Sequence, residues 1–233
     1  MKFEQSLARG KFLKRYKRFL VDVETEDGET LTIHCPNSGS MKTCMGPQWP
    51  VLFSDSGNPK RKLRHSMEMI HNGDCWIGIN THRANGIVVE AITEGRIHQF
   101  PKYELLKQEV PYGKNSRVDI LLKIDERLCY IEVKNVTLVH DDGYYIFPDA
   151  VTSRGLKHLN ELEKMVSEGH RAVMFYLVQR SDGDGFRPAA DIDPAYAKGL
   201  KKAITGGVEV VVYHANVTPA GIEIDREITN IQI

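Results

Sequence analysis

Residues 117–134 read RVDILLKIDERLCYIEVK and decide the fold of this chain. Two apolar runs flank the polar break Asp125-Glu126-Arg127, a pattern typical of a β-hairpin with a short loop. Side chains alternate between the two faces of a strand. We therefore expect Asp119 to point away from its apolar neighbours Val118, Ile120, Leu122 and Ile124.

The second run of the hairpin carries the chemistry. By the same alternation, Glu132 and Lys134 share one face, opposite Cys129, Ile131 and Val133. With Asp119 on the adjacent strand, two carboxylates could converge on a divalent metal, Mg²⁺ or Mn²⁺, because such ions take oxygen ligands. A metal so placed polarises a phosphoryl oxygen, and a neighbouring lysine neutralises developing charge. A plain surface ion pair between Glu132 and Lys134 is the alternative.

Composition limits the classes of protein that fit. A chain of 233 residues with 41% hydrophobic and 27% charged residues suits one large or two small globular domains. The sequence has no apolar run long enough for a membrane span, and its start lacks the apolar core of a signal peptide. Its four cysteines form no C-x-x-C pair, so we expect a cytoplasmic protein with reduced thiols and no membrane partner.

Charge is distributed unevenly although the formal net charge is +0. Residues 1–65 contain twelve Lys and Arg against seven Asp and Glu, a surplus of five positive charges. Two basic stretches account for much of it, and both are candidates for phosphate contacts with nucleic acid, with an aromatic ring available for stacking. An edge strand guarded by charges and a solvated loop are the alternatives. The candidate residues are Lys14, Arg15, Tyr16, Lys17, Arg18, Lys60, Arg61, Lys62 and Arg64.

The N-terminal third is typical of a small β-barrel. Asp27-Gly28 is a hairpin signal between apolar runs, and residues 51–54 form another short apolar run. Several short strands joined by turns indicate a barrel of the OB type. His34, Cys35 and Cys44 fit no familiar zinc spacing.

The pattern changes near residue 80. Asn80-Thr81 can cap a helix, and a second helix is indicated by Leu156, Leu159, Leu162 and Val166 at helical spacing. Residues 171–178 and 208–213 are apolar strands, and Asp193-Pro194 can begin a third helix. The order of elements predicts an α/β (α+β) three-layer domain on a mixed sheet. We therefore divide the chain into an OB-like module, residues 1–79, and a second domain, residues 80–233.

Four segments together resemble the sugar fermentation stimulation protein A (SfsA) family. They are residues 14–19, residues 34–41, residues 130–134 and the long segment FPDAVTSRGLKHL at residues 147–159. The resemblance covers nearly the whole chain in order. It implies an OB-like module followed by a PD-(D/E)XK restriction-endonuclease-like domain, with non-specific DNA binding and a proposed regulatory role in sugar (maltose) metabolism.

The resemblance also assigns site residues. Asp119, Glu132 and Lys134 match the acidic and basic positions of the PD-(D/E)XK superfamily, although Val118 stands where its proline would be. Such proteins often add an acid from the first helix, for which Glu90 is the candidate and Glu104 the alternative. Arg154, Lys157 and His158 fall within about one helical turn and could contact a scissile phosphate.

Two functions follow from these residues. The first is a DNA-binding regulator of sugar metabolism with a nuclease-like core. The second is a Mg²⁺-dependent phosphodiesterase that cleaves DNA or RNA through Asp119, Glu132 and Lys134. An enzyme acting on a nucleotide or small phosphate is a third interpretation, but the chain has no Gly-rich phosphate loop to support it. The sequence indicates no oligomeric state.

Overall fold

The computed structural model describes residues 1–113 and 116–233, and its N-terminal part is a closed barrel. Five strands pair in the order β3-β2-β1-β4-β5, and a parallel bridge between His34 and Ser66 joins β3 to β5 and closes the barrel. This confirms the OB-like barrel. Buried side chains such as Val21, Ile33 and Met67 fill its interior. The strands are β1 (Ala8–Tyr16), β2 (Leu20–Thr25), β3 (Thr30–His34), β4 (Pro50–Asp55) and β5 (His65–His71), with β6 (Trp76–Gly78) added beside β5.

The second part is built on a six-stranded sheet in the order β15-β14-β12-β9-β8-β7. Strands β9, β12 and β14 are parallel, and the outer pairings are antiparallel, so the sheet is mixed as expected. The hairpin turn is shorter than the predicted break, because Ile124 pairs directly with Arg127. The strands are β7 (Leu105–Tyr112), β8 (Ser116–Ile124), β9 (Arg127–Val136), β12 (Arg171–Val178), β14 (Glu209–Thr218) and β15 (Gly221–Glu227).

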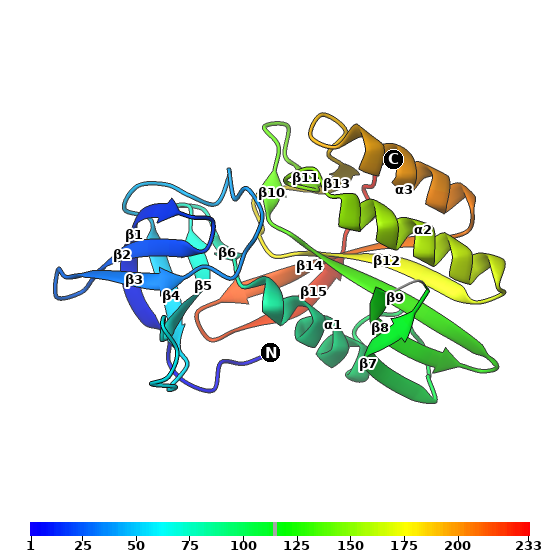
Figure 1. Cartoon of the computed structure of the whole chain (residues 1–233), viewed down its shortest axis with the longest axis horizontal. Helices are drawn as coiled ribbons and strands as arrows, with labels where there is room; N and C mark the ends of the chain where they lie inside the picture. The colour runs from blue at the N-terminus through cyan, green and yellow to red at the C-terminus, as the bar shows by residue number, and fades with distance from the viewer. Residues whose placement is uncertain (114–115) are drawn as a thin grey trace.

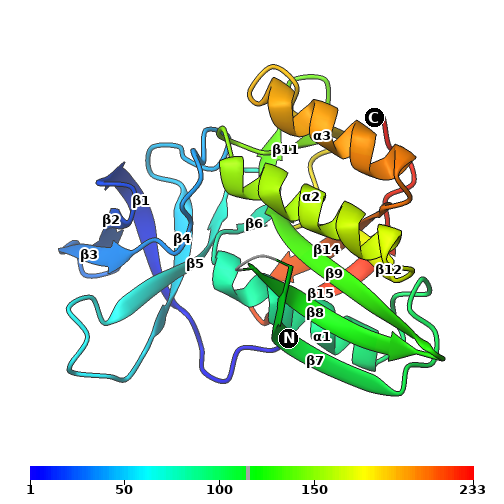
Figure 2. The ribbon, with the colours of Figure 1, turned by 45° about the vertical axis from the view of Figure 1, so that its right-hand side comes forward.

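Helices cover both faces of this sheet, which completes the predicted three layers (Figures 1 and 2). A 3-10 turn η1 (Thr81–Arg83), capped by the Asn80 side chain, leads into α1 (Ala84–Thr93) on one face. Helices α2 (Ser153–Ser167) and α3 (Pro194–Thr205) lie on the other, capped by Thr152 and Asp193. A small sheet of β10 (Leu138–Val139), β11 (Tyr144–Phe147) and β13 (Gly185–Pro188) lies beyond the end of β9.

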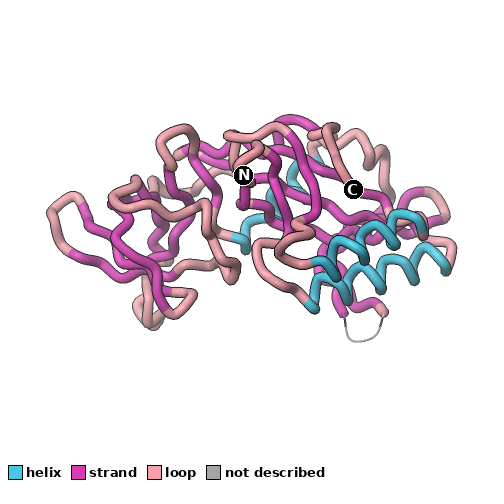
Figure 3. The backbone as a smooth tube through the Cα atoms, turned by 90° about the horizontal axis from the view of Figure 1, so that it is seen from above, coloured by secondary structure: helices cyan, strands magenta, loops and turns pink. Residues whose placement is uncertain are grey.

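The two parts lie end to end, with the barrel at one end of an elongated molecule and α2 and α3 side by side at the other (Figures 1 and 3). Buried contacts join them. The Gly78 amide donates to the Gln179 carbonyl at 2.9 Å, and the buried Arg180 donates to the Thr43 hydroxyl at 2.8 Å. Cys44 Sγ also donates to the Thr137 carbonyl at 3.2 Å, so the β3–β4 segment of the barrel is held against the ends of β9 and β12. Within the described residues, no helix is long and apolar enough to cross a membrane.

Candidate metal and phosphate site

Asp119 occupies the point where two central strands stop pairing. At this end, the last residue pair of the β8–β9 ladder is Ile120 and Ile131. Beyond that pair, Val133 N on β9 donates to Asp119 Oδ2 at 2.8 Å. From helix α1, Asn85 Nδ2 donates to Asp119 Oδ1 at 3.0 Å. A side-chain acceptor therefore replaces a main-chain acceptor here, and both carboxylate oxygens are fixed.

This irregularity corrects one expectation of strand alternation. Val118 was expected on the face of Ile120, but it packs in the core beneath α2 and α3, whereas Ile120 packs beneath α1. The regular alternation holds only where the ladder is regular, and it breaks at Asp119. Opposite Asp119 on β7, Glu109 has a positive φ of 52°, which also interrupts the strand pairing.

Glu132 is the most deeply buried acid of the site, with 2% of its surface exposed. Its Oε1 accepts a hydrogen bond from Lys134 Nζ at 2.6 Å and a second one from His158 Nδ1. Its Oε2 is buried and has no hydrogen-bond partner among the described residues. A buried carboxylate oxygen without a partner is costly, so this oxygen is an open ligand position.

His158 fixes the orientation of Glu132 from helix α2. Arg154 Nε lies 3.3 Å from His158 Nε2, and a guanidinium can only donate. We therefore assign His158 as the tautomer that accepts at Nε2 and donates from Nδ1 to Glu132 Oε1. The ring is buried, and its Nδ1 also lies 3.4 Å from Lys134 Nζ.

The two carboxyl groups differ electrostatically. Burial and the negative charge of Glu132 raise the pKa of Asp119 to about 6, against its ordinary 3.8. For Glu132, burial acts to raise the pKa, but the His158 hydrogen bond and the Lys134 charge outweigh it and hold the pKa below its ordinary value. Glu132 therefore stays ionised. Full ionisation of Asp119 would need a positive charge in addition to that of Lys134, such as a bound metal ion.

These donors fit a divalent cation of the Mg²⁺ type. Such ions are often held by one or two carboxylates, with water and substrate phosphate completing the shell. Among the described residues, Glu132 Oε2 has no hydrogen-bond partner. The second carboxylate is that of Asp119, whose ionisation the charge of Glu132 disfavours. No group of three or more His, Cys, Asp or Glu side chains is arranged as a metal cage in residues 1–113 and 116–233.

The structure does not bring Glu90 or Glu104 to the site, so both expectations are wrong. Glu90 accepts a hydrogen bond from the Met1 amine and lies 3.7 Å from Arg96 Nη2. It stands five residues after Asn85, about 140° around the helix, so it faces away from Asp119. Glu104 pairs with Lys123 near the other end of β8, at 2.6 Å between Oε2 and Nζ.

Two polar neighbours of Asp119 were missed by sequence reasoning. Asn85 holds Asp119, and its Nδ2 also lies 3.4 Å from Glu109 Oε1, which brings a third, exposed carboxylate to the edge of the site. No local signal marks either residue. Their proximity depends on how α1 and β7 pack beside β8.

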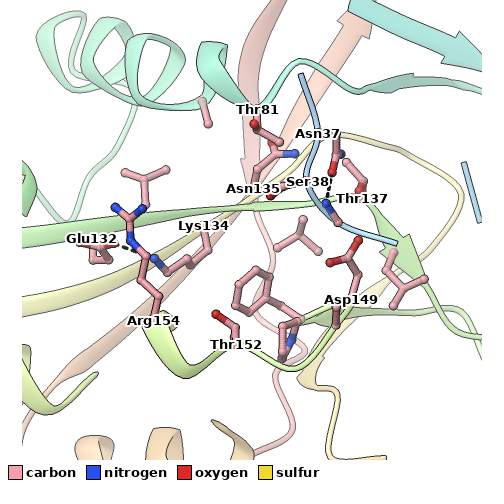
Figure 4. Close-up of a pocket in the computed structure, with 18 of the residues that line it drawn as sticks. Asn37, Ser38, Thr81, Glu132, Lys134, Asn135, Thr137, Asp149, Thr152 and Arg154 are labelled. Atoms are coloured by element: carbon pink, nitrogen blue, oxygen red, sulfur yellow. Dashed lines mark hydrogen bonds and ion pairs between the residues drawn. The ribbon is translucent and has the colours of Figure 1, made fainter. Parts of the chain in front are cut away.

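A cleft of about 700 Å³ opens beside these residues (Figure 4). We call it the junction cleft, because both parts of the chain line it. The barrel contributes Arg18 and the β3–β4 loop residues 37–39, and the second part contributes the site itself. Its further lining includes His82, Asn135, Thr137, Asp149, Thr152 and Arg154.

The basic residues of β1 serve the barrel itself. All five N–H donors of Arg15 are taken by backbone carbonyls of Arg18, Asn37, Gly39 and Ser40, at 2.7–3.2 Å. Tyr16 donates to Asp22 at 3.1 Å, and Lys14 Nζ lies 3.5 Å from the same carboxylate. The guanidinium of Arg15 is therefore committed to loop structure, and we leave Arg15 out of the phosphate contacts proposed below.

Other predicted cations are exposed. Lys17 and Arg18 form the β1–β2 turn, and Lys60, Arg61 and Lys62 lie in the β4–β5 loop. Arg64 in the same loop pairs with Asp55 at 2.5 Å between Nη2 and Oδ2. Lys157 is exposed on α2, one residue before His158.

Family models match nearly the full length of the chain. The model described as the SfsA N-terminal OB domain matches residues 13–79, and the Sugar fermentation stimulation protein RE domain matches residues 82–221.

Known proteins are similar over the same length. A sugar fermentation stimulation protein homolog of Geotalea uraniireducens is 50% identical over 217 residues, covering 93% of this chain and 94% of that protein. A homolog of Rhodospirillum rubrum is 52% identical over 238 residues, covering 97% of each. Among solved structures, SfsA of Pyrococcus furiosus in complex with Ca²⁺ superposes with a TM-score of 0.88 at 23% identity, covering 100% of this chain and 98% of that one.

Proposed function

The chain belongs to the sugar fermentation stimulation protein family, and we propose that it is a metal-dependent phosphodiesterase that acts on nucleic acid. Asp119 and Glu132 are its metal ligands, Lys134 is the catalytic cation, and His158 is a positioning residue. The Pyrococcus furiosus protein was solved in complex with Ca²⁺, which supports a divalent ion in a protein of this fold.

The observation that carries the proposal is the state of Glu132. Its Oε1 takes both available donors, Lys134 and His158, while its buried Oε2 takes none. A purely structural ion pair needs no second oxygen held in this way. A Mg²⁺ or Mn²⁺ ion bound here would polarise a phosphoryl oxygen and lower the pKa of a bound water.

The chain's own groups supply the rest of the chemistry. Lys134 Nζ lies where it can neutralise charge that develops on a phosphate next to Glu132. Arg154 lines the cleft and contacts His158, so a guanidinium is available to orient the phosphate. Because His158 donates to Glu132 from a buried position, it restricts the carboxylate to one orientation.

Cleavage and metal binding test the proposal together. Purified protein would be incubated with end-labelled DNA and RNA, single-stranded and duplex, with Mg²⁺, Mn²⁺ or EDTA. Wild type should cleave with metal, whereas Glu132→Gln and Lys134→Met should not. Thermal melts should show stabilisation by Mn²⁺ that Glu132→Gln loses and Lys134→Met keeps.

Glu90→Gln is the matched control, because it removes a carboxylate outside the site. It should cleave and bind metal like wild type. No metal-dependent stabilisation of wild type at millimolar metal, or cleavage that survives in Glu132→Gln, would contradict the proposal.

A second function is favoured by the exposed basic residues of the β1–β2 turn and β4–β5 loop. It is non-specific DNA binding without cleavage, in a protein that regulates sugar (maltose) metabolism. Tight DNA binding that persists in EDTA, with no cleavage in any metal, would favour this function over the first.

A further inference from the structure

We propose, resting on the phosphodiesterase function above, that the substrate is a single strand of nucleic acid. In this proposal the strand runs from an aromatic platform on the barrel, formed by Phe19 and His34, into the junction cleft. Its phosphates follow Arg61, His82 and Arg18 toward Lys134.

The size of the junction cleft limits what can reach Asp119 and Glu132. Its volume of about 700 Å³ is in the range of pockets that enclose a small ligand. Such a space has room for roughly one or two nucleotides, which favours a single strand over a duplex. Because barrel residues 37–39 form one wall and β9 forms another, the substrate has to pass between the two parts of the molecule.

The aromatic platform stands on the barrel beside the cleft. Phe19 is 43% exposed at the β1–β2 turn, so its ring is accessible to a ligand. Its ring stacks on His34 with centroids 6.4 Å apart and an interplanar angle of 26°. Burial, and the neighbouring Arg61 and His82, lower the pKa of His34, which favours its neutral ring. Accessible neutral rings of this kind bind bases by stacking, independently of sequence.

Arginine and histidine side chains connect the platform with the cleft. His82 borders both the junction cleft and a second hollow of about 600 Å³, which also exposes His34 and Arg61. On the cleft side, Arg18 lies one residue before Phe19. The strand would therefore contact the β1–β2 and β4–β5 loops, which are the loops with which OB-folds bind oligonucleotides.

The charges within the cleft orient the strand. Lys134 and Arg154 lie on the side of Glu132, whereas Asp149 and Asn37 lie across the cleft (Figure 4). Phosphates are attracted to the first side and repelled by the Asp149 carboxylate. Bases would therefore point toward the amide and hydroxyl groups of Asn37, Asn135 and Thr137, which can bond their edges.

Binding without cleavage tests this path directly. Fluorescence anisotropy would compare a labelled DNA or RNA strand of about 12 nucleotides, within the span that one OB-fold contacts, with its duplex, using full-length Glu132→Gln in EDTA. We expect single strands to bind at least about tenfold more tightly than duplex. On this background, Phe19→Ala should weaken single-strand binding by roughly 5- to 100-fold. Each of Arg18→Ala and Arg61→Ala should lower the salt slope of log K by about 0.7.

Leu105→Ala is the matched control, since Leu105 is also an exposed large apolar residue, at 36%, but lies on β7. It should bind like its background. Equal or tighter binding of duplex, or equal effects of Phe19→Ala and Leu105→Ala, would overturn the path.

The two proposals fail in different ways. Metal-dependent cleavage of duplex that is unaffected by Phe19→Ala would overturn the path and leave the phosphodiesterase intact. Selective single-strand binding without cleavage by wild type in any metal would keep the path and remove the phosphodiesterase.

Discussion

Replacing Asp119 by asparagine should have an effect on stability that depends strongly on pH. Folding raises the pKa of Asp119 to about 6 from an ordinary 3.8, through burial and the charge of Glu132. The folded state therefore binds this proton more tightly, and stability is lost as the pH rises from about 4 through 6. The full cost of ionisation is about 3 kcal/mol at pH 8 and about 1.6 kcal/mol at pH 5.

Asparagine removes this cost but weakens one contact. Asp119 accepts from both Val133 N and Asn85 Nδ2, and an amide has a single oxygen, so we expect a loss of about 1–1.5 kcal/mol. In metal-free buffer, Asp119→Asn should therefore be about 1.5–2 kcal/mol more stable than wild type at pH 8 and nearly equal to it at pH 5.

Urea unfolding of both proteins in EDTA at the two pH values measures this change. Between pH 5 and pH 8, the stability difference between Asp119→Asn and wild type should change by about 1.4 kcal/mol, which corresponds to roughly 3–6 °C in Tm for a chain of this size. Asp125→Asn, in the exposed turn of the same hairpin, is the control and should show no such swing. If Asp119→Asn destabilises the protein equally at pH 5 and pH 8, the electrostatic account of the site is wrong. Metal at about ten times its Kd should raise the unfolding free energy of wild type by about 1.4 kcal/mol and should not stabilise Asp119→Asn.

Other substitutions separate structural from functional residues. Arg15→Ala should cost about 2–4 kcal/mol of unfolding free energy because it leaves loop carbonyls unpaired, whereas Arg18→Ala should cost within about 0.5 kcal/mol; thermal melts compare them. Gly39→Ala places a Cβ in steric conflict with the Asp149 carboxylate and should cost about 1–3 kcal/mol, part of which Asp149→Ala should restore in the double variant. Glu90→Gln should leave the Mn²⁺-dependent shift in Tm unchanged, and a reduced shift would show that Glu90 senses the metal site.

Local pattern was sufficient for most of the fold. The hairpin, the apolar strand at residues 171–178 and the three helix starts depend on residues close in sequence, and the structure has them where periodicity and capping indicate. Alternation also placed Glu132 and Lys134 on one face, and they do lie in contact. It failed at Val118, since Asp119 takes the place of a backbone acceptor there.

The rest of the site depends on contacts between distant segments. Whether a helix acid reaches Asp119 depends on the rotation of α1, which Asn85 fixes and which turns Glu90 toward Met1. A basic stretch likewise does not reveal which cations are free, and Arg15 turned out to bind carbonyls 22–25 residues away. The junction cleft joins residues 37–39 with residues 148–150, a proximity that no periodicity encodes.

The contact between Gly39 and Asp149 also bears on how such proteins diverge. The two residues lie on different parts of the chain, and there is no room for a side chain at position 39 while Asp149 keeps its place. A change at either position alters what the other tolerates, so we expect the two to be substituted together among relatives. A chimera that joins this barrel to the sheet of another family member would inherit a matched pair only if both parents carry compatible residues at these two positions.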